Sequence, residues 1–325
     1  MAFATSAFLS ENQCPKLKVL TNYTRVSFDI KGVIAPVFTP FDDAGCVNFS
    51  LIPEYFKYLH ENGVQGILVG GTTGESITLS LDERRALLEA WVKARPDGMK
   101  IIMQVGGVPM PDVIKMAQYA EQLKADAIMT LPEIYYKPKT VEHLVDYLHA
   151  VSSAAPSLPL LYYHFPMMSG VDVNMPAFFK LASARIPNFK GMKADLGVAL
   201  QVSDQLGEDQ RIFNGNHLVA PPVLLGHDSS IATVTNMFPR LVRAVIDAVK
   251  SGEVVKAKAL QEKLNALVTA ISSQGEFLPT MKAAMPMITG IQVGPPRRPL
   301  ASIDDQKKNQ LMEDLKRLNF GRMDE

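Results

Sequence analysis

The chain has 325 residues, of which 47% are hydrophobic, 20% charged and 8% aromatic. This composition is typical of a globular protein with a large core, and it excludes disordered and collagen-like chains. Lysine and arginine together number 33 and are balanced by 33 aspartates and glutamates, so the net charge is zero at pH 7. A neutral chain without a dense basic run is not expected to bind nucleic acid or an acidic membrane surface. No apolar run reaches the roughly 18 residues of a membrane span.

The cysteine and histidine residues show no metal-binding pattern. Cys14 and Cys46 stand apart rather than in a CxxC pair, and none of the six histidines belongs to an HExxH motif or a Cys/His cluster. We therefore expect no bound metal. The sparse use of cysteine is typical of a reducing compartment such as the cytoplasm.

Residues 1–31 differ in composition from the rest of the chain. They are rich in serine and threonine and slightly basic, and they lack the apolar core of a secretory signal. Two interpretations remain, an N-terminal arm and an organellar transit peptide. Because no amphipathic arginine face is present, we favour the arm.

Eight short apolar runs follow from residue 32 onward. Each run is apolar at consecutive rather than alternating positions, as in parallel strands that are buried on both faces. The runs are VIAPVFTPF (33–41), VQGILVGG (64–71), KIIMQVGG (100–107), DAIMTLP (126–132), PLLYYHF (159–165), FKGMKAD (189–195), RIFNGN (211–216) and SSIATVT (229–235).

Amphipathic segments between these runs predict helices, for example over 81–94, 111–124 and 140–154. Ser80, three residues before Glu83, forms the capping-box pattern that begins a helix. After the last run, the pattern predicts helices near 238–250, 253–272, 276–288 and 303–318.

Strands that alternate with helices predict an α/β fold with a parallel sheet. Eight such units in about 220 residues favour a closed (β/α)8 TIM barrel over a doubly wound sheet, which more often has five to seven strands. We expect the arm at 1–31, the barrel at 32–251 and a C-terminal helical extension at 252–325. No linker or repeat indicates a further domain.

The active site of such a barrel lies at the carboxyl ends of its strands. Lys193 ends the sixth apolar run, where its ammonium group faces a barrel mouth that removes it from water. Desolvation favours the neutral amine, which can form a Schiff base with a ketone. The alternative is a lysine that merely reaches solvent, and position alone leaves the two interpretations about equal.

Two further candidates follow other runs. The loop GGTTGES (70–76) offers backbone N–H groups and hydroxyls that suit a carboxylate, although a plain glycine turn explains it equally well. Tyr163 ends the fifth run and is either a proton shuttle or an aromatic side chain that fills the barrel.

Taken together, these residues resemble the N-acetylneuraminate lyase and dihydrodipicolinate synthase family of class I pyruvate aldolases. The similarity rests on the loop Gly71-Thr72-Thr73-Gly74-Glu75, on Tyr163-His164-Phe165-Pro166 and on Gly191-Met192-Lys193, in this order, and it extends from about residue 32 to 300. The lyase branch is the more similar. The synthase branch has an arginine shortly after the proline, where this chain has Met167-Met168-Ser169-Gly170.

The resemblance implies a role for each matched residue. Lys193 would form an imine with the C2 ketone of a 2-oxo acid, so that no cofactor is needed. Thr72 and Thr73 would hold the carboxylate, and Tyr163 would take the proton of the C4 hydroxyl as the C3–C4 bond breaks. The partners would be a sialic acid and pyruvate, and the family relationship implies a homotetramer.

The part of the site that holds the aldehyde departs from the lyase pattern. The lyases have an Asp-Glu pair two residues after the glycine of the seventh run, where this chain has His217 and Leu218 after Gly215 and Asn216. They usually have serine or threonine at the position of Asp195, and often serine at that of Thr233. For this half of the substrate we expect contacts from Asp195, Gly215, Asn216, His217 and Thr233, with the Asp195 carboxylate in place of the missing acids. We therefore expect a preference among sialic acids that differs from that of the usual lyase, such as for an analogue with a hydroxyl group at C5.

Two other functions remain open from the sequence. The enzyme could act as an aldolase or dehydratase on another 2-oxo sugar acid, which the missing acidic pair favours. A barrel that binds a 2-oxo acid without turnover is the other alternative, and the presence of Lys193, Tyr163 and the threonine loop argues against it.

Overall fold

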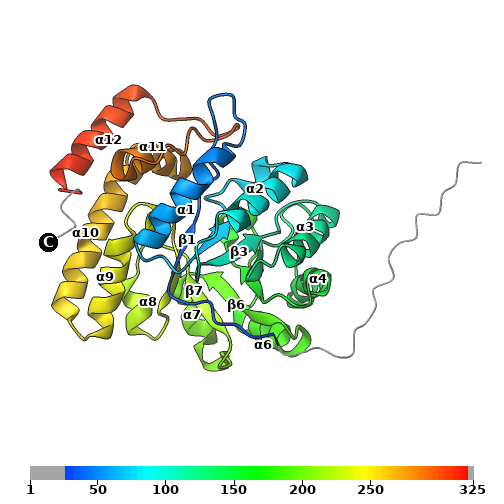
Figure 1. Cartoon of the computed structure of the whole chain (residues 1–325). Helices are drawn as coiled ribbons and strands as arrows, with labels where there is room; N and C mark the ends of the chain where they lie inside the picture. Colours follow the sequence, from blue (N-terminus) through cyan, green and yellow to red (C-terminus); the bar gives the residue numbers. More distant parts are fainter. Residues whose placement is uncertain (1–25, 321–325) are drawn as a thin grey trace, which may run out of the picture.

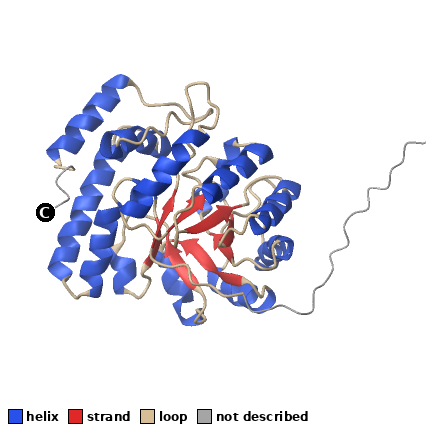
Figure 2. Ribbon diagram, viewed as in Figure 1, coloured by secondary structure: helices blue, strands red, loops and turns tan. Residues whose placement is uncertain are grey.

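The eight predicted strands form a closed parallel barrel in the computed structural model, which describes residues 26–320. Each strand pairs with its neighbour in chain order, and the first pairs with the eighth, so the described barrel has no open edge. Figure 2 shows these strands at the centre of a ring of helices. The strands are β1 (Val33–Pro36), β2 (Gly66–Val69), β3 (Lys100–Gln104), β4 (Ala127–Thr130), β5 (Leu160–Tyr163), β6 (Phe189–Ala194), β7 (Arg211–Asn214) and β8 (Ser229–Ile231).

Every strand is shorter than the apolar run that predicted it, because the runs continue into the loops. Within a strand, alternate residues enter two different cores. Ile34, Leu68 and Ile102 belong to the inner cluster that fills the barrel, whereas Ala35 and Ile67 belong to the cluster between strands and helices. Both faces are apolar, which explains why the sequence shows no alternation between polar and apolar residues.

Helices follow the strands and cover the outside of the barrel (Figure 1). The predicted capping box is confirmed, since the Ser80 side chain accepts from the Glu83 amide and the Glu83 carboxylate accepts from the Ser80 amide. The helices of the barrel are α1 (Ile52–Glu61), α2 (Leu81–Lys93), α3 (Met110–Gln122), α4 (Val141–Ala154), α5 (Pro166–Ser169), α6 (Met175–Arg185), α7 (Leu196–Val202), α8 (Ala220–Leu224) and α9 (Pro239–Lys250). Short 3-10 turns are η1 (Phe49–Leu51), η2 (Ser76–Thr78), η3 (Ser203–Gln205) and η4 (Thr233–Asn236).

Within residues 252–320, three helices follow the barrel, and we call this part of the chain the C-terminal extension. They are α10 (Val254–Ser272), α11 (Phe277–Thr289) and α12 (Asp305–Arg317). The long helix α10 packs against α9 and α8, and both α11 and α12 pack against α10. Figure 1 shows this group, in yellow to red, along one side of the barrel. Leu264, Leu267 and Met285 bury their side chains in the same apolar cluster as the outer faces of the strands.

The segment before β1 contacts the barrel interior. Ile30 is buried in the inner cluster, and Phe28 packs edge-on against Phe213, with 6.4 Å between ring centroids. The predicted N-terminal arm at 1–31 lies mostly outside the described residues, and so does Cys14. Among the described helices, none is long and apolar enough to cross a bilayer.

Candidate active site

Lys193 lies near the carboxyl end of β6, beside Tyr163 at the end of β5. Its side chain is 7% exposed, and its Nζ atom donates a 2.8 Å hydrogen bond to the Tyr163 hydroxyl. The same nitrogen lies 4.1 Å from the centre of the tyrosine ring. The alternative of a lysine that simply reaches solvent is therefore wrong.

Two glycines make room for this lysine and its strand. A Cβ atom at Gly215 would lie 3.2 Å from the Lys193 Cε atom, so a larger residue would crowd the lysine stem. Gly191 has φ of +123°, and a Cβ atom there would lie 1.9 Å from the Arg211 carbonyl oxygen. Only glycine fits at this position of the strand. The Gly-Met-Lys pattern thus has a steric basis as well as a chemical one.

Tyr163 connects Lys193 to the loop after β2. Its hydroxyl lies 3.0 Å from the Thr72 hydroxyl, and either group can donate in this hydrogen bond. The ring belongs to the inner cluster of the barrel and stacks on Phe165 with 10° between the planes. Tyr163 therefore fills the barrel and also presents its hydroxyl to the lysine, and its role as a proton shuttle stays a prediction. The three side chains form a continuous path of hydrogen bonds from Thr72 to Lys193.

Thr73 bonds to a different partner from Thr72. Its hydroxyl lies 2.8 Å from the Thr233 hydroxyl, which links the loop after β2 to the segment after β8. The prediction that Thr233 and Thr235 lie within the eighth strand is wrong. The strand ends at Ile231, and both threonines belong to the 3-10 turn η4. The apolar run extended too far because Val234 of this turn is itself buried in the core.

The loop between β7 and α8 contains Gly215, Asn216, His217 and Leu218. The Asn214 side-chain amide donates to the carbonyl oxygens of Asn216 and Leu218, and the Asn216 side chain accepts from the Leu218 amide. His217 is partly buried, and this burial lowers the pKa of its imidazole, so the ring is neutral at pH 7. Leu218 is 43% exposed. The loop therefore presents a neutral ring and an apolar side chain at the positions of the usual acidic pair.

Asp195 has a structural role that was not predicted. Its carboxylate accepts a 2.9 Å hydrogen bond from the Val198 amide and so forms the N-cap of α7. The residue is exposed, at the carboxyl end of β6. A contact between this carboxylate and a substrate stays a prediction.

Several buried polar residues around the loops were not predicted. The Gln104 side-chain amide donates to the Gly70 carbonyl and the Ser76 hydroxyl, and so fixes both ends of the loop after β2. Lys282 of α11 and Gln261 of α10 reach loops from the extension. A single lysine in the apolar segment MKAAMPMI is a signal that could have identified Lys282, because lysine is almost never fully buried without a partner.

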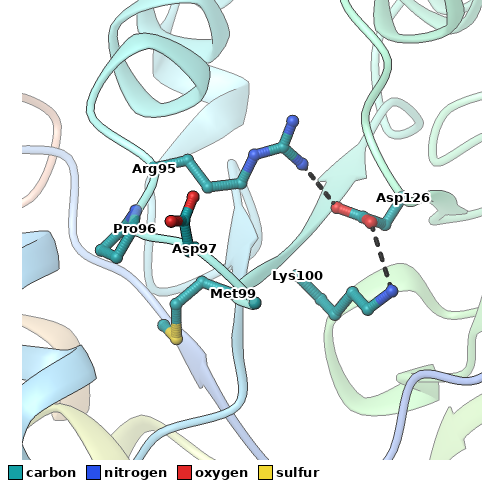
Figure 3. A pocket seen from close by; sticks show the side chains of 7 residues that line it. Arg95, Pro96, Asp97, Met99, Lys100 and Asp126 are labelled. Atoms are coloured by element: carbon teal, nitrogen blue, oxygen red, sulfur yellow. Dashed lines mark hydrogen bonds and ion pairs between the residues drawn. The ribbon is translucent and has the colours of Figure 1, made fainter.

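The opposite end of the barrel has a pocket of about 270 Å³ beside the beginning of β3 (Figure 3). There Asp126 pairs with Arg95 at 2.8 Å and with Lys100 at 3.6 Å. Residues at this end of a TIM barrel contribute to stability rather than to chemistry. Across the described part of the chain, no group of three or more His, Cys, Asp and Glu residues could hold a metal ion.

Comparisons with known proteins find relatives along nearly the whole chain. The sequence profile of the dihydrodipicolinate synthetase family matches residues 29–318. N-acetylneuraminate lyase of Xenopus tropicalis is 32% identical, and the match covers 84% of this chain and 91% of the relative. N-acetylneuraminate lyase of Homo sapiens is 30% identical, and the match covers 90% of this chain and 93% of the relative. Among solved structures, N-acetylneuraminate lyase of Proteus mirabilis has a TM-score of 0.85 at 30% identity and covers 90% of this chain and 99% of that one. The similarity therefore spans both the barrel and the extension.

Proposed function

Because the chain belongs to the dihydrodipicolinate synthetase family, we propose that it is a class I pyruvate aldolase that cleaves a sialic acid reversibly to pyruvate and an aldehyde sugar. The substrate is N-acetylneuraminate or a close analogue, and the sugar is N-acetylmannosamine or its analogue. The observation that carries the proposal is the buried contact between Lys193 and Tyr163 at the carboxyl end of the barrel.

The reaction begins when the neutral amine of Lys193 attacks the C2 ketone of the open-chain sugar acid. Loss of water from the resulting carbinolamine gives an imine, which withdraws electrons from the C3–C4 bond. The lysine itself supplies this electron sink, so the reaction needs no cofactor. Lys193 is 7% exposed, so the imine forms at a position that is largely closed to solvent.

Cleavage requires a base for the C4 hydroxyl, and Tyr163 takes this role as its phenolate, after it has given its own proton to the water that leaves the carbinolamine. Its hydroxyl lies within hydrogen-bond distance of both the Lys193 nitrogen and the Thr72 hydroxyl, so a proton can move between the lysine, the substrate and the loop. As the C3–C4 bond breaks, the aldehyde leaves and an enamine of pyruvate remains on the lysine. Protonation at C3 and hydrolysis of the imine then release pyruvate. Acid–base help of this type contributes roughly 10²–10⁴-fold to the rate.

Two sets of residues bind the two halves of the substrate. Thr72 and Thr73 hold the carboxylate through their hydroxyls and the backbone N–H groups of their loop. The aldehyde half lies against Asp195, Thr233 and the loop with Gly215, Asn216 and His217. We further propose that the protein is cytoplasmic, because its sparse use of cysteine is typical of a reducing compartment. The family resemblance supports a homotetramer.

The test combines a covalent trap with a substrate panel. Incubation with pyruvate and borohydride, followed by peptide mass mapping, should place a reduced three-carbon adduct on the peptide with Lys193. The same preparation should release pyruvate from at least one member of a panel of sialic acids and 2-keto-3-deoxy sugar acids. An adduct on another lysine contradicts the mechanism. If pyruvate is released only from the 2-keto-3-deoxy sugar acids, the substrate belongs to that class and not to the sialic acids.

A further inference from the structure

Lys282 of the extension reaches the loop that carries Thr72 and Thr73. Its Nζ atom lies 2.7 Å from the Glu75 carboxylate and also donates to the carbonyl oxygens of Thr39 and Pro295, each at 3.0 Å. The side chains of both Lys282 and Glu75 are 1% exposed. Burial lowers the pKa of Lys282, and the facing carboxylate opposes this shift. A buried charge with three oxygen partners fixes the geometry around it, because a buried charge that loses a partner is strongly destabilising.

Glu75 transmits this contact to the threonines. Its φ is 53°, a left-handed conformation that a residue other than glycine keeps only where its surroundings fix it. Its amide donates to the Thr72 carbonyl, and its second carboxylate oxygen accepts from the Arg297 amide of the extension. Two parts of the extension therefore hold a residue that lies two positions after Thr73.

Gln261 of α10 makes the corresponding contact with the loop after β7. Its side-chain oxygen accepts from the amides of Val219 and Ala220, at 2.8 and 2.9 Å, and its side-chain nitrogen donates to the His217 carbonyl at 2.9 Å. The residue is 8% exposed. One buried side-chain amide thus makes hydrogen bonds to three backbone groups of the loop in which His217 and Leu218 stand at the positions of the usual acidic pair.

We infer that the C-terminal extension positions the two halves of the substrate site separately, through Lys282 for the pyruvate half and through Gln261 for the aldehyde half. This inference rests on the proposed function for the assignment of each loop to its half. Both are positioning residues, because they act through backbone and side-chain groups of the loops. The two contacts come from different helices and involve different loops, so loss of one should leave the other in place.

For the aldehyde half, the test variant is Gln261→Leu, which keeps the approximate size of the side chain and removes both polar atoms. We expect the KM for the aldehyde sugar in the condensation direction to rise by about tenfold, since three backbone groups lose their partner. The KM for pyruvate and the pyruvate dependence of borohydride trapping on Lys193 should stay within about twofold. Gln261→Glu keeps oxygen acceptors for Val219 and Ala220 and should recover part of the loss.

For the pyruvate half, the test variant is the double substitution Glu75→Gln with Lys282→Met. The pair is replaced together because removal of one partner leaves an uncompensated buried charge that can prevent folding. We expect about a tenfold higher pyruvate concentration for half-maximal trapping, with an unchanged KM for the aldehyde sugar. The matched control is Gln274→Leu, since Gln274 bonds to Asp314 within the extension and should leave both constants unchanged.

Amide hydrogen exchange gives a second readout that needs no substrate. Gln261→Leu should accelerate exchange in residues 215–220, and the double variant should accelerate it in residues 72–76. The inference is overturned if a variant changes both KM values equally or accelerates exchange equally in both loops. It is also overturned if neither variant changes the KM values or the exchange. If pyruvate is not trapped on wild-type Lys193, the proposed function fails, while the exchange pattern still decides whether the two contacts act separately.

Discussion

The Lys193 amine donates a 2.8 Å hydrogen bond to the Tyr163 hydroxyl across neighbouring strands β6 and β5. Because both residues occupy strand ends that pair in register, the barrel itself fixes their separation. In the proposed mechanism Lys193 is the nucleophile and Tyr163 transfers the proton, and two groups held on one scaffold need little rearrangement before reaction. The two residues are therefore expected to contribute to different steps, and their variants should separate those steps.

Tyr163→Phe should lower kcat by about 10²-fold or more while pyruvate is still trapped on Lys193. The substitution keeps the ring that packs in the inner cluster and removes only the hydroxyl. Steady-state rates and the yield of the borohydride adduct measure the two effects. A near-normal kcat would mean that Tyr163 only fills the barrel.

The two adjacent threonines should differ in effect, because their hydroxyls have different partners. Thr72→Val removes the group 3.0 Å from the Tyr163 hydroxyl and should mainly lower kcat, by about tenfold or more. Thr73→Val removes the contact with Thr233 and should mainly raise the KM for pyruvate. Valine has nearly the shape of threonine, so each variant is the control of the other. Identical kinetic changes in both would contradict separate roles.

The sequence predicted the position of Lys193, Tyr163 and the threonine loop because each directly follows or ends a buried apolar run. Parallel strands bring such ends to one face, so their closeness in space followed from the fold alone. The end of β8 was predicted too far along the chain. The criterion that identified the strands, a run of buried apolar residues, also matches the turn that follows β8. Buried apolar residues continue into the turn η4, and a run of them cannot show where a strand stops.

Contacts between distant parts of the chain could not be predicted in this way. Glu75 and Lys282 are 207 positions apart, and no local pattern assigns one as the partner of the other. The N-cap role of Asp195 had a local signal, since an aspartate before a helix is a favoured cap.

The protein should lose stability as the pH falls below about 6.5, and His164 should account for part of the loss. His164 is 6% exposed, and burial lowers its pKa, while Asp172 and Asp195 oppose this shift without reversing it. Between the lowered pKa and the ordinary value, the unfolded chain binds more protons than the folded one. The free energy of unfolding therefore rises with pH in this window, by at most about 1.4 kcal/mol per pH unit for one site.

The measurement is urea unfolding of the wild type and of His164→Leu at pH 7.5 and 5.5. The variant should show a smaller difference between the two values than the wild type. Tyr162→Phe is the control, because it changes the ring next to His164, at 6.0 Å between centroids, without removing a group that titrates in this window. An equal pH difference in His164→Leu and the wild type would exclude His164 as a cause.

Asp195 offers a way to separate a structural role from a substrate contact. Asp195→Asn keeps an N-cap for α7 and removes the charge, whereas Asp195→Ala removes both and should cost about 1 kcal/mol of stability. If the carboxylate binds the hydroxyl tail of the sugar acid, both variants should raise the KM for the sugar acid far more than that for pyruvate in the reverse reaction. An effect confined to the stability of Asp195→Ala would leave Asp195 with its capping role only.

Substrate preference should follow the loop between β7 and α8. His217 is a neutral ring at pH 7 and Leu218 is partly exposed, so the loop lacks the two charges that would accept hydrogen bonds from the sugar tail. A site that hydrogen-bonds hydroxyls discriminates strongly, because a substrate that leaves buried polar groups unpaired binds poorly. His217→Asp with Leu218→Glu should therefore raise kcat/KM for N-acetylneuraminate relative to its C5-hydroxyl analogue. Leu224→Glu adds a charge at an exposed position of α8 and should leave the ratio unchanged. If the double variant and this control give the same ratio, the loop does not set the preference.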